Sequence, residues 1–166
     1  MKKMIVLVLT MMVLGGCAIA LKPDFVEKAN NDLGIKPVVY QRADWIQGVY
    51  GYPSFSEALT SKISIIRGAL VCSDNKVVFL RFNKQLEKYV PIFELSYDEI
   101  TNLTMARKGA GRRLVLHEKR NVYTIEIVKG AMIDREKTVM FHNFIANKLG
   151  MPLLPDEKNI EDKKDE

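Results

Sequence analysis

The chain has 166 residues, a formal net charge of +5 at pH 7, two cysteines and two histidines. This length gives room for one domain with a hydrophobic core but hardly for two. The histidines and cysteines lie far apart in the sequence, which argues against a zinc site, and no serine lies in a Gly-x-Ser-x-Gly context. We therefore expect no metal, no cofactor and no enzymatic activity.

The N-terminus has the layout of a secretory signal peptide, with two lysines ahead of an apolar run over residues 4–14. The run ends in Leu14-Gly15-Gly16-Cys17, which resembles the lipobox of bacterial lipoproteins. This resemblance implies cleavage before Cys17, a diacylglycerol on its thiol and a further acyl chain, such as palmitate, on its amino group. Residues 1–16 are then the signal peptide, and Cys17 is the site of lipid attachment.

An uncleaved transmembrane anchor is the alternative, because residues 4–21 contain no charge and are just long enough to span a bilayer. Two adjacent glycines lower the helix propensity of this stretch, and a plain anchor does not need the cleavage-like ending, so we favour the lipoprotein. Both interpretations place the chain from Ala18 onward in the cell envelope, facing the periplasm or the cell exterior. Alanine after the cysteine goes with transfer to the outer membrane in lipoproteins of double-membraned bacteria. A location in the cell envelope excludes nucleic acid as a partner.

Residues 17–37 are expected to form a lipidated tether, within which Asp24 is placed to cap a short helix. The folded domain is expected over residues 38–152. Its first part, residues 38–55, is rich in aromatic side chains, which we assign to the core rather than to a binding surface. A capping box from Ser54 to Glu57 predicts a second short helix that begins at Phe55.

From residue 63 the sequence changes to runs of β-branched and aromatic residues, separated by turn signals. Six strands are predicted, over residues 63–72, 76–82, 88–95, 100–107, 112–118 and 121–128. Pro91 has no backbone N–H, so the third of these strands is predicted to lie at a sheet edge. Cys72, at the end of the first strand, is expected to be a small buried hydrophobe.

The last three strands can be aligned in register. Short turns between them place Leu103, Leu116 and Tyr123 in one cross-strand row and Met105, Leu114 and Ile125 in the next. The opposite face then carries Thr104, Val115 and Thr124, with Arg113 opposite Glu126. One apolar and one mostly polar face predict an antiparallel sheet that is exposed on one side.

The period then changes to that of a helix. Asp134 can cap a helix whose apolar positions Phe141, Phe144, Ile145 and Leu149 have helical spacing, and Gly150 ends it. Beyond the domain, residues 153–166 are expected to form a charged, disordered tail, because residues 156–166 contain six acids, three lysines and one apolar residue.

These elements predict an α+β domain of antiparallel sheets with a C-terminal helix packed over an open end. Their order resembles the pleckstrin-homology-like (PH-like) superfold, including bacterial GRAM-like domains. The resemblance covers about residues 65–149 and depends on Gly68-Ala69-Leu70 entering a hairpin, on residues 93–100 stepping between sheets and on the final helix. It implies a half-open barrel or sandwich of about six to seven strands, with the seventh within residues 38–52.

Few residues suggest chemistry. His117 is expected to face outward beside Val122 and Asn102, and His142 lies off the centre of the apolar stripe of its helix. The adjacent acids Asp98 and Glu99 lie at a chain corner without a visible acid–base partner.

Three classes of function are left. The first is a non-catalytic module, anchored through Cys17, that binds a protein partner in the cell envelope. The second is a binder of anionic lipid headgroups or another anion through the basic hairpin 107–113, where a loop over residues 108–111 puts Arg107 directly opposite Arg112 beside Lys108. The third and weakest is a hydrolase of unrecognised type.

Overall fold

The computed structural model describes residue 21 and residues 23–47, 64–108 and 111–155. Cys17, the helix expected from Phe55 and most of the charged tail lie outside these residues. Within the described ranges no helix is both long and apolar enough to cross a membrane.

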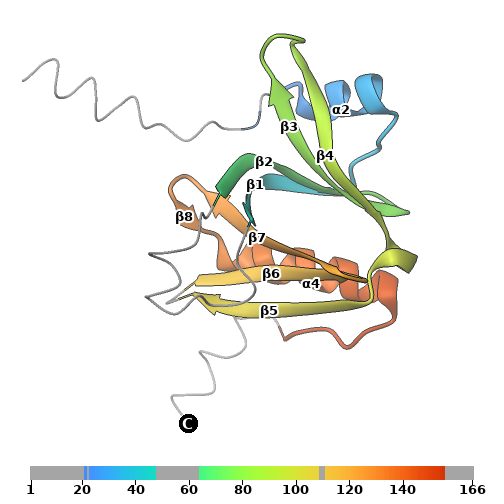
Figure 1. Ribbon diagram of the computed structural model, residues 1–166, viewed down its shortest axis with the longest axis vertical. Coiled ribbons are helices and arrows are strands. Elements are labelled where there is room, and N and C mark those ends of the chain that lie inside the picture. Colours follow the sequence, from blue (N-terminus) through green and yellow to red (C-terminus); the bar gives the residue numbers. More distant parts are fainter. Residues whose placement is uncertain (1–20, 22, 48–63, 109–110, 156–166) are drawn as a thin grey trace, which may run out of the picture.

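Antiparallel strands form most of the domain (Figure 1). They are β1 (Val39–Gln47), β2 (Ser64–Cys72), β3 (Lys76–Asn83), β4 (Lys88–Ser96), β5 (Asn102–Lys108), β6 (Gly111–Glu118), β7 (Asn121–Lys129) and the short β8 (Met132–Ile133). The helices are α2 (Phe25–Leu33), a single 3-10 turn η1 (Tyr97–Glu99) and α4 (Arg135–Leu149).

The strand order is β4-β3-β2-β1-β7-β6-β5, with β8 added to β7. Strand β1 pairs with both β2 and β7 and so joins two halves of one sheet. Strands β4 and β5 end this path and do not pair with each other, so the barrel is half-open. The predicted fold class is confirmed: the domain is α+β, its antiparallel strands do not close into a full barrel, and the C-terminal helix α4 packs against the β5–β7 half (Figure 1). Strand β1 is the seventh strand expected within residues 38–52.

The predicted register of the last three strands is also confirmed. Leu103 pairs with Leu116 and Leu116 with Tyr123, while Leu114 joins Met105 to Ile125. The exposure expected for the opposite face is wrong at its centre, where Val115, Thr124, Arg113 and Glu126 are buried. Burial is possible there because Arg113 Nε donates to Glu126 Oε1 at 2.7 Å, so each buried charge has an opposite charge beside it.

The main core lies between the two halves of the sheet and α4. Phe141, Ile145 and Ala146 of α4 are fully buried against residues such as Leu70, Phe79 and Leu114. Asp134 caps this helix as predicted, because its carboxylate accepts the backbone N–H of Lys137 at 3.0 Å. Gly150 ends the helix with a φ of +67°, which is rare for a residue with a side chain.

A second core lies on the outer face of β2–β4, where α2 packs. Phe25, Ala29 and Ile35 are buried against Val71, Leu80 and Tyr89, among others. The folded body therefore begins before residue 38 and includes part of the expected tether. Asp24 precedes α2 as expected, but its side chain forms no capping hydrogen bond. At the other end the body reaches Leu154, whose N–H donates to Asn143 Oδ1 at 2.8 Å.

Candidate functional site

Strands β2 and β3 separate at Gly68. Strand β2 pairs with β1 along its whole length, but it pairs with β3 only over residues 69–72. Beyond Leu80, β3 continues to Asn83 with β4 as its only described neighbour. The first half of β2 and the last part of β3 are therefore the two sides of a gap in the sheet.

Gly68 lies where the two strands separate, and only glycine fits there. A Cβ at this position would meet the Leu80 carbonyl oxygen and would lie 2.7 Å from Phe79 Cε1. The Phe79 ring can pack over the strand because Gly68 has no side chain.

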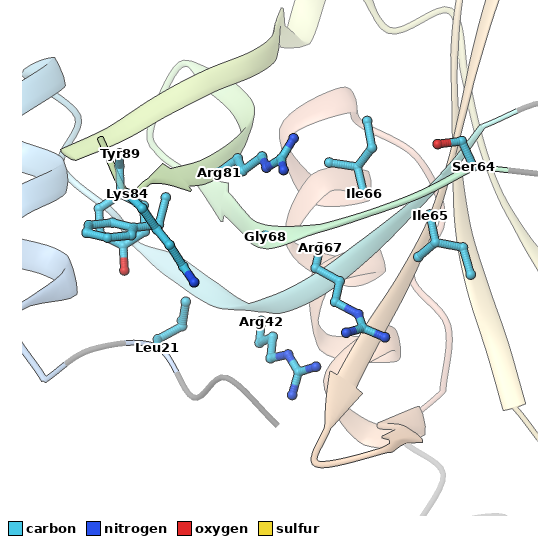
Figure 2. A pocket seen from close by; sticks show the side chains of 11 residues that line it. Leu21, Arg42, Ser64, Ile65, Ile66, Arg67, Gly68, Arg81, Lys84 and Tyr89 are labelled. Carbon is cyan, nitrogen blue, oxygen red and sulfur yellow. The ribbon is translucent and has the colours of Figure 1, made fainter. Parts of the chain in front are cut away.

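The gap opens into a pocket of about 710 Å³ (Figure 2). Four of its lining side chains are cationic: Arg42 of β1, Arg67 of β2, Arg81 of β3 and Lys84 of the β3–β4 turn. The other lining residues are Leu21, Ser64, Ile65, Ile66, Gly68, Phe82 and Tyr89. None of the described residues that line the pocket is acidic, so its described lining carries four positive charges and no negative one.

The strand register explains how two of the cations come together. In the β1–β2 pair Arg42 is opposite Ala69, and Asp44 is opposite Arg67. Arg42 and Arg67 are therefore diagonal neighbours on one face, at a typical separation of about 7–8 Å. In Figure 2 both side chains extend to the same side of β2, whereas Arg81 lies on the other side of the strand. The cations thus surround the open edge of β2.

Three of the four cationic side chains form no ion pair with a described residue, although Asp44 lies opposite Arg67 in the β1–β2 pair. Arg67, Arg81 and Lys84 are exposed, and their side chains form no hydrogen bond or ion pair with any described residue. Arg42 is half-buried, and its Nη1 donates to the carbonyl of Gly130 at 3.1 Å. Elsewhere Lys76 lies 2.7 Å from Glu94, and Lys148 lies 3.3 Å from Asp74. The pocket therefore collects cations whose charges an external anion could neutralise.

Aromatic packing holds one wall of the pocket. Tyr89 is buried and meets Phe25 edge-on, with the ring centroids 4.8 Å apart. Tyr89 also contacts Phe82, and Leu21 packs against the same cluster. The turn that carries Lys84 is held by Asn83, whose Oδ1 accepts the N–H groups of Gln85 and Leu86 at 2.9 and 3.2 Å. Lys84 thus lies beside a wall of packed aromatic side chains.

The basic hairpin predicted as an anion site is a separate feature. Arg107 pairs with Arg112 in the β5–β6 register, as expected, and Lys108 pairs with Gly111. Arg107 is exposed, and Arg112 is half-buried with an interaction of its own. None of these three residues is among the described residues that line the pocket. The loop residues 109–110 lie outside the described ranges, so anion binding at this hairpin stays a prediction.

The cysteine, histidine and acidic residues considered for catalysis or metal binding are part of the fold's own packing, pairing and hydrogen bonding. Cys72 is fully buried, as predicted, and burial raises the pKa of its thiol. His117 pairs with Asn102 and Val122, as expected. Glu99 accepts hydrogen bonds from the Ser96 N–H and hydroxyl at 2.8 and 2.6 Å, which lowers the pKa of its carboxyl group. The described residues contain no group of three or more histidines, cysteines or acids that could hold a metal.

No protein-family model matches the sequence, and no curated protein matches it. Among solved structures the chain is similar to the Slm1 PH domain in complex with inositol-4-phosphate, with a TM-score of 0.45 and 16% identity over 68% of this chain and 95% of that one. It is also similar to the same domain with phosphoserine (TM-score 0.45, 15% identity, 69% and 97% coverage). The C-terminal domain of an unknown protein from Leishmania infantum gives a TM-score of 0.45 and 10% identity, over 75% of this chain and 94% of that domain.

Proposed function

We propose that this protein is a non-catalytic, membrane-anchored module that binds a phosphate-bearing anion, such as an anionic lipid headgroup, in the pocket between β2 and β3. One observation carries the proposal: four cationic side chains line one pocket, and no described acid is among the lining residues. Arginine presents a planar fork that binds phosphate through two hydrogen bonds, and lysine adds a compact charge. A pocket of about 710 Å³ is large enough for a headgroup-sized ligand.

Membrane attachment is part of the proposal, and the Leu14-Gly15-Gly16-Cys17 sequence supports it. Each buried methylene contributes about 0.8 kcal/mol, so two or three acyl chains hold a protein firmly where one chain holds it only marginally. The protein would then face the periplasm or the cell exterior from its membrane. A protein partner in the envelope stays a prediction from the sequence, for which the described surface specifies no chemistry.

The lining residues also favour binding over catalysis. They supply positive charge and apolar surface, whereas Ser64, a lining hydroxyl, has no histidine or carboxylate beside it among the described lining residues. A nucleophile needs such a base within hydrogen-bond reach.

Vesicle binding tests the proposal. The chain from Ala18 to Glu166 keeps every described residue and can be mixed with vesicles of phosphatidylcholine, with or without phosphatidylglycerol. Binding should require the anionic lipid and weaken as salt rises. The double substitution Arg67→Glu and Arg81→Glu should weaken binding at least about 20-fold, because each basic residue near an anionic surface contributes about 1 kcal/mol.

The matched control is Lys36→Glu with Arg120→Glu, which makes the same charge change at exposed positions outside the pocket. A second comparison is Arg107→Glu with Arg112→Glu in the hairpin. Equal binding by the pocket double variant and the matched control, or no binding even at low salt, would refute the pocket as the anion site. Selective loss in the hairpin variant, at unchanged thermal stability, would move the site to residues 107–112.

A further inference from the structure

The pocket lies close along the chain to the expected lipid attachment site. Leu21 lines the pocket and packs, half-buried, against the cluster that contains Phe25 and Tyr89. Cys17 precedes Leu21 by four residues. Four residues span at most about 14 Å when fully extended, so a lipid on Cys17 keeps this wall of the pocket within that distance of the bilayer interface.

This distance is comparable to the layers over which a membrane surface acts. The polar region of each leaflet is about 5–8 Å thick, and the Debye length at physiological salt is about 8 Å. Helix α2 begins four residues after Leu21 and is fixed to the sheet, because Phe25 is buried and Lys28 Nζ donates to the Glu87 carbonyl at 3.2 Å. Leu21 and α2, the described residues nearest to Cys17 in the chain, are therefore fixed to the body beside the pocket.

Two exposed aliphatic side chains flank the cations. Ile65 lines the pocket and is 56% exposed, and Leu86, in the same turn as Lys84, is 57% exposed. Aliphatic side chains beside lysine and arginine suit the boundary between headgroups and acyl chains. The side of the domain that includes Leu21 and the pocket thus presents both positive charges and exposed aliphatic side chains.

From this arrangement we infer that the pocket faces the leaflet that holds the lipid on Cys17 and takes an anionic phosphodiester headgroup from that same leaflet. The inference rests on the proposed function and on lipidation of Cys17. It adds the source of the ligand: the headgroup is bound in cis, and neither an opposing membrane nor a soluble phosphate supplies it. The β3–β4 turn with Leu86 then contacts the bilayer, while η1, at the other end of β4, points away from it.

The test uses the mature lipidated protein, reconstituted into phosphatidylcholine vesicles with or without a minority of phosphatidylglycerol. A fluorophore on Leu86→Cys reports contact with lipids that carry a headgroup quencher, and Asp98→Cys is the matched control. The nine residues of β4 separate these two sites by about 30 Å. Labelling is selective, because lipid occupies the Cys17 thiol and Cys72 is fully buried.

Quenching at residue 86 and not at residue 98 is expected when phosphatidylglycerol shares the vesicle with the protein. This quenching should be lost with Arg67→Glu and Arg81→Glu.

Quenching only when the phosphatidylglycerol is in a second vesicle population, with clustering of vesicles, would overturn the cis inference and keep the proposed function. The same quenching at residue 86 with and without phosphatidylglycerol, together with binding of inorganic phosphate by the protein in phosphatidylcholine vesicles, would assign the pocket to soluble phosphate instead. Equal quenching at the two sites, or recovery of a chain without lipid on Cys17, would overturn the inference alone. No quenching at either site, with identical behaviour of the double variant, would overturn both.

Discussion

The buried ion pair between Arg113 and Glu126 allows a sharp test of what holds the β5–β7 half of the sheet. Nε and Oε1 are 2.7 Å apart, and the two side chains are only 8% and 10% exposed. Removal of one partner leaves the other charge buried, which costs about 3–5 kcal/mol, whereas removal of both leaves no such charge. We expect Arg113→Met and Glu126→Met each to lower the free energy of unfolding by that amount, and the double variant to lie within about 2 kcal/mol of the wild type.

Urea titration followed by far-ultraviolet circular dichroism measures these differences, and a double-mutant cycle gives the coupling energy. The control is the Lys76–Glu94 pair, which has the same 2.7 Å separation but is 29% and 40% exposed. Lys76→Met should cost less than about 1 kcal/mol, because water screens exposed pairs. Additive single losses in the cycle, or a cost for Arg113→Met no larger than that for Lys76→Met, would refute the reasoning that burial makes this pair structurally important.

Three further outcomes are expected. Phe141→Ala should lower the free energy of unfolding by about 3–5 kcal/mol, since Phe141 is fully buried; a denaturant midpoint close to wild type would mean that α4 is instead an exposed interaction surface. Gly68→Ala should cost about 1–3 kcal/mol, because its Cβ would lie 2.7 Å from Phe79 Cε1, and an unchanged melting temperature would contradict the close approach of β3. Cys72 should resist alkylation until the chain unfolds, and rapid labelling of the native protein would show that its thiol is accessible. The free energy of unfolding should also fall above about pH 9, because there the thiol ionises only in the unfolded chain.

The β5–β7 half could be predicted from the sequence because its signals are local. Alternation of apolar and polar residues fixes which side chains face the core, and short turns leave one register that keeps Leu114 and Leu116 inside. The same alternation failed to predict the burial of Thr124 and Arg113. A polar residue on an outer face looks exposed in the sequence unless its buried partner is known, and the Arg113–Glu126 contact depends on packing between strands.

The pocket could not be predicted, because its residues are brought together only by the separation of two strands. Arg42, Arg67, Arg81 and Lys84 come from three strands and a turn, and each looks in the sequence like an ordinary exposed position. The sequence instead favours Arg107, Lys108 and Arg112, because these cations are close together in the chain. A usable signal was Gly68 beside Arg67 in an otherwise apolar strand, since a glycine within a strand often marks the close approach of another backbone.

The proposed lipid on Cys17, close to the pocket along the chain, would also bear on how tightly the pocket has to bind. Linking two attachments makes the second one intramolecular, at an effective concentration that is millimolar for short flexible linkers. If acyl chains on Cys17 hold the protein to its membrane, as proposed, a pocket with millimolar affinity for a single headgroup would be substantially occupied. Exposed cations such as Arg67, Arg81 and Lys84 suit this task, because screened charges give weak, salt-sensitive and exchangeable binding. The lipid would then supply the affinity for the membrane, and the pocket would set which side of the domain faces it.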